Sequence, residues 1–384
     1  MQTTTTRTPL LAGADAERAL DIAERIVAGA EGLLAPNAAP ESMGSYGGAT
    51  IVAEALARAG RGGGEGQVRA LLRQALVFAP DRLGLYDGAA GLLVALDVVD
   101  PERAALAAVR ERLRGALAAS LAAPPALDFG HVPTYDLISG VAGQAIALRA
   151  DVPAALPALR AYAEQLADAA TERLAAYDVL APLNLGLAHG IPGLLAALNF
   201  ALPGERALGR RYVDLLLGMA HRVEGAYRWD SVWRPAECPS ARRAWCYQTV
   251  GVAAVLYDRA RLDGDDALRA LAADALAAVL DERHDASQSW DAALCHGRSG
   301  VAAIAWHFSD DPRLVRHAGA LARRVLAEYD PGRVLGYRSF NLRDRREEDR
   351  ADFLDAALGV AQFLIDAATA QERRWLPLFG LLPD

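Results

Sequence analysis

The sequence is poor in cysteine, and its basic residues do not outnumber its acidic ones. The 384 residues include three cysteines, and 48 Asp and Glu against 40 Lys and Arg give a formal net charge of -8. Three cysteines do not make a disulfide framework, and an odd number leaves at least one thiol unpaired, which favours a reducing compartment. Nucleic-acid recognition needs a basic stripe, and none is present. We therefore expect a cytoplasmic protein with no nucleic-acid partner.

Long apolar segments are also missing. Residues 1–14 are Thr-rich and lack the apolar core of a signal peptide. No apolar run approaches the roughly 20 residues that cross a bilayer. The Gly-rich stretch 61–66 lacks the Lys-Ser/Thr pair of a phosphate-binding loop, and no Asp-rich diphosphate motif supports prenyl or terpene chemistry. We expect a flexible N-terminus over residues 1–14 and no integral membrane segment.

A Gly-containing turn followed by an apolar, Ala-rich segment recurs seven times. The turns begin at Tyr46, Asp87, Ser139, His189, Tyr247, His296 and Asp355. They recur about every fifty residues, which is room for two helices and their loops. Glycine in these turns is expected to allow close backbone approach and positive φ.

Two kinds of helix are predicted to alternate along the chain. The segments after the turns, such as 194–198 and 301–305, are apolar all round and must be buried. Between them lie amphipathic segments such as 16–35, for which Asp15 is the expected N-cap. The last repeat, residues 352–365, is as apolar as the middle ones, whereas an open array needs polar caps at both ends. We predict an all-α fold, an α/α toroid (barrel) of seven inner and seven outer helices in one domain over residues 15–384.

Strand signals are confined to one short region. The stretch 227–239 holds two tryptophans and two prolines and is expected to form a small hairpin. Residues 342–350 are almost wholly charged and are expected to be a solvated loop. No other strand is expected.

Two thiols and an imidazole share the leading edge of the repeated turns. Cys246 lies in one turn, and Cys295 and His296 lie in the next. A toroid would bring the starts of neighbouring inner helices together. Two thiolates and a neutral imidazole suit Zn²⁺, and three protein ligands rather than four leave a position open, as in catalytic sites. Either cysteine alone would more often be a small buried residue, and Cys238, outside the repeated turn, is expected to be a bystander.

Four motifs resemble those of the lanthionine synthetase C-like family, the cyclases of lanthipeptide biosynthesis. They are Tyr135-Asp136-Leu137-Ile138-Ser139-Gly140, Ala188-His189-Gly190-Ile191-Pro192-Gly193, Trp245-Cys246-Tyr247 and Cys295-His296-Gly297. The resemblance runs from the first Gly turn to the last. It implies an α/α toroid of seven helix pairs that holds one zinc ion, in agreement with the repeat count.

The resemblance also implies a site and a reaction. Cys246, Cys295 and His296 match the zinc ligands of the family, and the active-site positions fall on Asp136, His189, Arg242 and Tyr247. The implied reaction is Michael addition of a peptide cysteine thiol to a dehydroalanine or dehydrobutyrine of the same peptide, which forms a thioether ring. Arg242 would stabilise the enolate, and His189 would protonate its carbon. Asp136 would orient that imidazole or accept the thiol proton.

Each of these four side chains has a simpler interpretation. His189 could cap a helix, and Asp136 could cap its own turn. Arg242 competes with Arg243 and could be a surface arginine, and Tyr247 could only pack the inner layer. Two further positions depart from the family pattern, because Gln248 and Ala356 stand where it has glycine. The first of these is expected to alter the surroundings of the zinc site.

The expected partners follow from the implied reaction. They are a dehydrated precursor peptide and a separate dehydratase, since no kinase, lyase or dehydratase motif precedes the toroid. Two alternatives remain open. One is addition of glutathione or another small thiol to dehydrated protein residues. The other is a non-catalytic toroid that binds a peptide, with zinc only stabilising the fold.

Overall fold

The computed structural model describes residues 7–34, 46–77, 82–100, 106–176, 183–234, 243–282, 291–341 and 346–383. These residues form fourteen α-helices and two short hairpins. The helices are α1 (Ala14–Leu33), α2 (Gly48–Arg58), α3 (Gly64–Val77), α4 (Ala89–Val99), α5 (Ala107–Ala122), α6 (Val141–Leu148), α7 (Leu156–Ala176), α8 (Ile191–Ala201), α9 (Arg206–Gly218), α10 (Thr249–Asp263), α11 (Asp266–Asp281), α12 (Arg298–His307), α13 (Pro312–Ala327) and α14 (Ala357–Thr369). None of these helices is long and apolar enough to span a membrane.

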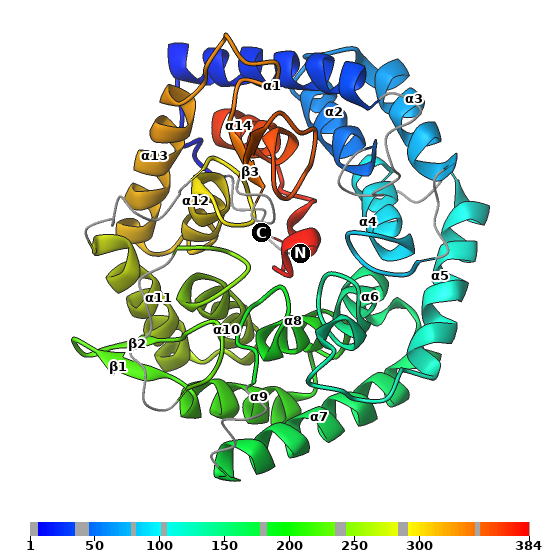
Figure 1. Cartoon of the computed structure of the whole chain (residues 1–384), viewed down its shortest axis with the longest axis vertical. Helices are drawn as coiled ribbons and strands as arrows, with labels where there is room; N and C mark the ends of the chain where they lie inside the picture. Colours follow the sequence, from blue (N-terminus) through cyan, green and yellow to red (C-terminus); the bar gives the residue numbers. More distant parts are fainter. Residues whose placement is uncertain are drawn as a thin grey trace. The chain divides into compact units, whose positions relative to one another are not determined.

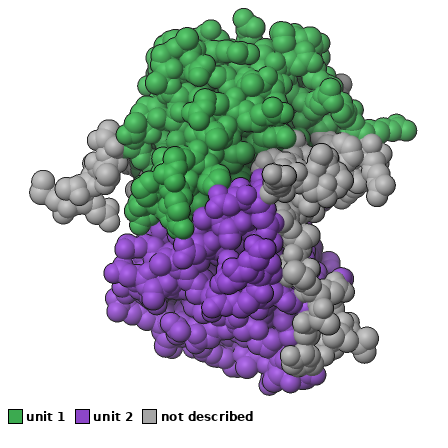
Figure 2. Space-filling view, turned by 90° about the vertical axis from the view of Figure 1, so that its left-hand side faces the viewer, with its two compact units in different colours: residues 1–78, 289–375, 383–384 green, residues 79–288, 376–382 purple. Residues whose placement is uncertain are grey.

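The chain forms two compact units (Figure 2). Unit 1 comprises residues 1–78, 289–375 and 383–384, and it contains α1 to α3 and α12 to α14. Unit 2 comprises residues 79–288 and 376–382, and it contains α4 to α11.

Unit 2 is built from two layers of helices. The even-numbered helices α4, α6, α8 and α10 pack against one another in chain order, and α5, α7, α9 and α11 cover them (Figure 1). In α10 every residue from Thr249 to Ala260 is buried, whereas α9 buries only one face. This difference follows from the sequence, since a helix without a polar face must be surrounded by protein.

Unit 1 repeats this arrangement around α14. The residues of α14 from Ala357 to Ala367 are all buried, and this helix packs against α1, α2 and α12. The segment before α1 is also attached to it, because the buried Leu11 donates its backbone N–H to Ala367 O at 2.9 Å. The N-terminus was predicted to be flexible over residues 1–14; residues 1–6 of this stretch lie outside the described residues.

The predicted N-cap of α1 is wrong by two residues. The helix begins at Ala14, and Gly13, with φ +56°, precedes it as the N-cap. Asp15 lies instead in the first turn, where its negative charge favours the positive end of the helix dipole.

The glycines of the repeated turns serve close packing. A Cβ on Gly190 would lie 2.2 Å from Asn184 O, and one on Gly297 would lie 2.4 Å from Ala293 N. The predicted close approach is therefore confirmed. Positive φ is wrong for these N-cap glycines, whose φ values are -134° and -113°, because the chain enters each helix from an extended conformation.

The two hairpins differ from the prediction. Strands β1 (His221–Val223) and β2 (Ala226–Arg228) pair antiparallel, so this hairpin begins before the predicted stretch 227–239 and shares residues 227–228 with it, while residues 235–239 lie outside the described residues. Its turn is Glu224-Gly225, both with positive φ, which suits a two-residue hairpin loop. A second hairpin, β3 (Ser339–Asn341) with β4 (Arg346–Glu348), falls partly where a solvated loop was predicted. Ion pairs from Glu347 to Arg333 and Arg338, at 2.8 and 3.0 Å, help to hold it.

Candidate functional site

Backbone hydrogen bonds connect the turns of consecutive repeats within each unit. In unit 2 they run from Tyr86 N to Ile138 O (3.1 Å), from Leu137 N to Ala188 O (3.0 Å) and from Ala188 N to Cys246 O (3.2 Å). In unit 1 the corresponding bond runs from Cys295 N to Leu354 O (2.9 Å). For every residue named in these bonds except Leu137, the next residue in the chain directly precedes the N-cap of a buried helix. These bonds therefore set the side chains at that position next to their counterparts in the following repeat.

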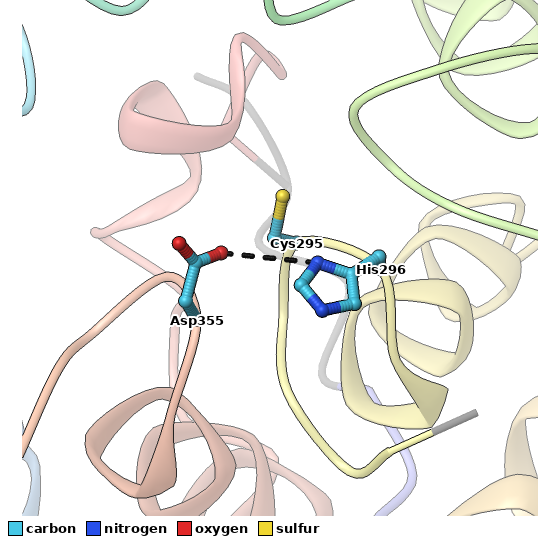
Figure 3. A group of neighbouring side chains, drawn as sticks. All are labelled: Cys295, His296 and Asp355. Carbon is cyan, nitrogen blue, oxygen red and sulfur yellow. Dashed lines mark ion pairs between the residues drawn. The ribbon is translucent and has the colours of Figure 1, made fainter. Parts of the chain in front are cut away.

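In unit 1 the turns before α12 and α14 bring three potential ligands together. Cys295 and His296 come from the first turn and Asp355 from the second (Figure 3). One donor atom from each, a thiol sulfur, an imidazole nitrogen and a carboxylate oxygen, lie within 4.8 Å of one another. His296 is buried, while Cys295 and Asp355 are partly exposed. The cluster is therefore open to a ligand on the side of the thiol and the carboxylate.

The two nitrogens of His296 face different carboxylates. Nε2 lies 3.3 Å from Asp291 Oδ2, and Nδ1 lies 3.8 Å from Asp355 Oδ1. Asp291 is buried, and its Oδ1 accepts a hydrogen bond from Ala293 N at 3.0 Å, which fixes the carboxylate. A carboxylate on one side of an imidazole favours the tautomer that leaves the other nitrogen to a metal.

The donor set fits a zinc ion. Zinc binds sulfur at about 2.3 Å and nitrogen or oxygen at about 2.0–2.2 Å in tetrahedral geometry, so two donors on one ion lie about 3.3–3.8 Å apart. The three donor atoms lie within 4.8 Å of one another, so side-chain shifts of up to about 1 Å would bring them onto one ion. Thiolate, imidazole and carboxylate are all common zinc ligands. Cys295, His296 and Asp355 could thus hold a metal ion.

Buried charge also shapes the turn before α14. Asp352 Oδ1 accepts hydrogen bonds from Leu354 N and Asp355 N, at 2.8 and 2.7 Å. Burial, reinforced by the neighbouring charge of Asp355, raises the pKa of Asp352 to about 6. The carboxylate of Asp352 therefore organises the turn that presents Asp355.

In unit 2 the predicted residues Asp136 and His189 are paired. Asp136 Oδ2 lies 2.7 Å from His189 Nδ1. Oδ1 of the same carboxylate accepts from Ser139 N and Gly140 N, at 2.8 and 3.0 Å. Asp136 therefore holds the backbone of its own turn and contacts the His189 ring. It is not the N-cap of α6, which is Gly140 with no side-chain cap, and its active-site role stays a prediction. For His189 the helix-capping interpretation is wrong, because the N-cap of α8 is Gly190, with no side-chain cap.

Cys246 and Tyr247 lie in the turn that follows that of His189. The Tyr247 ring centroid is 5.9 Å from that of His189, and the Cys246 carbonyl accepts the hydrogen bond from Ala188. The Cys246 side chain is buried. Cys246 belongs to unit 2 and the pair Cys295-His296 to unit 1, so the three-ligand set stays a prediction.

Arg242 and Cys238 lie outside the described residues. The rival of Arg242, Arg243, has its guanidinium at the end of α11, where Nε donates to Val279 O at 3.0 Å and a terminal nitrogen donates to Glu282 O. Arg243 is therefore engaged in structure, and the active-site role of Arg242 stays a prediction.

Comparison with known proteins identifies the family. Residues 66–379 match the family described as lanthionine synthetase C-like protein. The chain belongs to this family. Among solved structures, it is similar to nisin cyclase, with a TM-score of 0.72 and 15% sequence identity over 93% of this chain and 97% of that one. No curated protein sequence matches the chain.

The similarity confirms the predicted fold class. The alternation of buried and half-exposed helices from α1 to α14 and the match to nisin cyclase place this member of the lanthionine synthetase C-like family among the all-α, α/α toroid proteins. The seven buried helices are the even-numbered ones, as the seven repeated turns predicted.

The two departures from the family glycine pattern have different structural consequences. Gln248 precedes α10 with φ +67° and ψ -158°, a region that is essentially reserved for glycine. Ala356 precedes α14 with φ -150°, which any residue adopts. Of these two positions in this lanthionine synthetase C-like chain, Gln248 is therefore the strained one, and it is next to Tyr247.

Two carboxylates close to His296, those of Asp355 and Asp291, were not predicted from the sequence as part of a site. Asp355 occupies the same turn position as His296 and His189, directly before the N-cap of a buried helix, and this register was a signal for it. Asp291 is outside that register, and its proximity to His296 arises from the fold of the turn, for which the sequence offers no signal.

Proposed function

We propose that the protein is a zinc-dependent lanthionine synthetase. It would add cysteine thiols of a precursor peptide to dehydroalanine or dehydrobutyrine residues of the same peptide, and so form lanthionine and methyllanthionine rings. The observation that carries the proposal is the thiol-imidazole pair Cys295-His296, whose imidazole has the same turn position as His189, the partner of Asp136, in a chain of the lanthionine synthetase C-like family.

Three residues are the proposed protein ligands of the zinc ion. Cys295 and His296 are brought together by one turn, and Cys246 is proposed from the sequence and the family. A free cysteine has a pKa of about 8.5, so most of it is protonated at neutral pH. When bound, zinc would lower the pKa of the substrate thiol and so supply a nucleophilic thiolate.

His189 is the proposed proton carrier. The Asp136 carboxylate engages Nδ1, which leaves Nε2 as the nitrogen directed to the substrate. Nε2 would take the proton that leaves the thiol, and Asp136 would stabilise the resulting imidazolium. After the sulfur attacks the β-carbon, the carbon–carbon double bond becomes an enolate, and Nε2 returns the proton to its α-carbon. The peptide gains and loses no atoms.

Two further residues are assigned supporting roles. Arg242 is proposed from the sequence as the cation that stabilises the enolate oxygen. Tyr247, whose ring lies beside that of His189, would help to fix the imidazole. The substrate would reach this site already dehydrated, so we propose a separate dehydratase as the partner and the cytoplasm as the location.

The proposal is tested with a synthetic peptide that carries one dehydrobutyrine and one cysteine. Cyclisation leaves the mass unchanged but removes the thiol, so N-ethylmaleimide labelling followed by mass spectrometry counts the rings. Because such peptides also cyclise without enzyme, the rate and the stereochemistry of the ring are compared with an enzyme-free reaction. We expect faster cyclisation with one dominant stereoisomer, and loss of both effects in Cys295→Ala.

The same assay separates the alternatives. Addition of glutathione to the reaction would yield a peptide–glutathione adduct if the protein acted on small thiols. A rate and stereochemistry equal to the enzyme-free reaction, with the peptide nevertheless bound, would identify a peptide-binding protein and reject the cyclase. A zinc-free variant with an unchanged rate would reject the zinc-dependent mechanism.

A further inference from the structure

We propose that Asp355 is an additional ligand of the metal ion, so that unit 1 alone supplies a thiolate, an imidazole and a carboxylate. This inference rests on the zinc site of the proposed function: Cys246, Cys295 and His296 would keep their three positions, and the Asp355 carboxylate would occupy the fourth, which the substrate thiol takes in the reaction. Figure 3 shows the Asp355 carboxylate directed toward the His296 ring from the neighbouring turn.

The backbone fixes Asp355 beside the other two ligands. The hydrogen bond from Cys295 N to Leu354 O, at 2.9 Å, ties the residue before Asp355 to the residue before His296. Asp352 Oδ1 binds the backbone N–H of Asp355 at 2.7 Å, which holds the turn in shape. The position of Asp355 is therefore set by main-chain contacts rather than by the rotamer of an exposed side chain.

Close packing of the same two turns supports this placement. A Cβ on Gly359 would lie 2.6 Å from Leu294 Cδ1 and 2.0 Å from Phe353 O. Only glycine lets Leu294, the residue before Cys295, approach the first turn of α14 so closely. The turns that carry the Asp355 carboxylate and the Cys295 thiol are thus held close together.

The orientation of His296 completes the argument. Asp291 faces Nε2 at 3.3 Å and favours a proton there, which makes Nδ1 the nitrogen available to a metal. Nδ1 is also the nitrogen nearest to Asp355, at 3.8 Å from Oδ1. This separation is too long for a direct hydrogen bond but suits two donors on one ion. Two separate carboxylates thus occupy the two sides of the imidazole, one to orient it and one to share its metal.

The turn register explains why this position can contribute a ligand. In unit 2, two pairs of side chains that lie directly before the N-caps of consecutive buried helices are neighbours. Ser139 Oγ lies 3.3 Å from Asp87 Oδ2, and the rings of His189 and Tyr247 are 5.9 Å apart. Asp355 and His296 are related in the same way, because each lies directly before the N-cap of one of two consecutive buried helices. Asp355 therefore brings a carboxylate next to the pair Cys295-His296.

The test measures metal binding by the purified full chain. Zinc content is determined, and the zinc dissociation constant is obtained by competition with a chromophoric chelator, for the wild type, Asp355→Ala and the isosteric Asp355→Asn. The matched control is Asp87→Ala, which removes a carboxylate from the equivalent turn position of unit 2. Circular dichroism confirms that each variant is folded, and the visible spectrum of the cobalt-substituted protein reports the ligand set directly.

We expect the zinc affinity to fall by about 10- to 100-fold in Asp355→Ala and by a smaller factor in Asp355→Asn. It should not change in Asp87→Ala. The cobalt ligand-field bands should shift in both Asp355 variants, while the thiolate-to-cobalt charge-transfer band persists. If the wild type binds zinc and both Asp355 variants keep its affinity and its cobalt spectrum, Asp355 is not a ligand, and the proposed function stands. A wild type that binds no zinc would overturn both proposals.

Discussion

The carboxylate of Asp136 holds the imidazole of His189, with Oδ2 2.7 Å from Nδ1. Asp136 is almost fully buried, and its second oxygen accepts two backbone N–H groups, so the carboxylate cannot turn without breaking those bonds. The His189 side chain remains one-third exposed. A rigid, buried partner behind a solvent-accessible imidazole is the arrangement that proton transfer requires.

Replacement of Asp136 by Asn should separate orientation from charge. The amide oxygen can still accept the two backbone hydrogen bonds, but the group facing Nδ1 no longer stabilises a positive imidazole. We expect the rate of ring formation to fall by about 10²- to 10⁴-fold with the fold intact. The measurement is the thiol-labelling assay under single-turnover conditions, with Asp330→Asn, at an exposed carboxylate, as the control. An Asp136→Asn enzyme with the wild-type rate would remove this pair from the mechanism.

Asp291→Asn probes the other oriented imidazole. Asn keeps the shape of the side chain and the hydrogen bond to Ala293 N, but its amide group no longer favours a proton on His296 Nε2. We expect the zinc affinity to fall by about 10- to 100-fold. Chelator competition measures the affinity, and NMR of ¹⁵N-labelled histidine in the zinc-loaded protein reports which nitrogen carries the proton. If Asp291→Asn keeps the wild-type zinc affinity and a proton on His296 Nε2, Asp291 only stabilises the turn through Ala293 N.

Periodicity carried most of the fold prediction. The seven glycine turns and the fully apolar segments after them predicted the buried, even-numbered helices from α2 to α14, because a helix without a polar face must be surrounded by protein. One hairpin begins before the predicted stretch and the other was not predicted, because each strand is three residues long and is held by local contacts. The first hairpin depends on the turn Glu224-Gly225, and the second on the ion pairs of Glu347.

The candidate site was predictable where it follows the repeat. His189 and His296 share one register, and Asp136 emerged only through the family motif. Asp355 shares the register too, but a single Asp before Ala-Ala offers no chemistry until His296 is placed beside it. Asp291 was beyond sequence reasoning, because its contact with His296 depends on the path of a turn that contains no repeat signal.

Gln248→Gly should stabilise the protein. The positive φ of Gln248 costs about 1–3 kcal/mol in a residue with a side chain. Glycine removes that strain but also the buried side chain, whose Nε2 lies 3.3 Å from Asp230 Oδ1, so we expect a net gain in unfolding free energy of about 1 kcal/mol. Ala356→Gly is the matched control. It places glycine at the equivalent N-cap without strain to relieve, and it should change the unfolding free energy by no more than about 0.5 kcal/mol. Urea unfolding at fixed zinc concentration measures both, and equal effects of the two changes would refute the strain argument.

Asp366 makes the stability of unit 1 dependent on pH. This carboxylate is buried in α14, where Trp375 Nε1 and Gln362 Nε2 donate to it at 2.7 and 2.9 Å. Burial raises its pKa to about 7, against the opposing effects of these hydrogen bonds and of the positive charge of Arg373. The raised pKa means that the folded state holds the proton at pH values where the unfolded state has released it. The resulting stabilisation is complete below about pH 4 and is lost as the pH rises to about 7.

Asp366→Asn should abolish that dependence, because the amide does not ionise and can still accept from Trp375. Relative to the wild type, the variant should gain unfolding free energy between about pH 4 and pH 7, by up to about 4 kcal/mol, and the difference should be constant above that range. Urea unfolding of both proteins at several pH values measures the difference. Asp330→Asn, at an exposed carboxylate of unit 1, is expected to follow the wild-type profile. A difference between Asp366→Asn and the wild type that does not change with pH would mean that Asp366 is already ionised throughout.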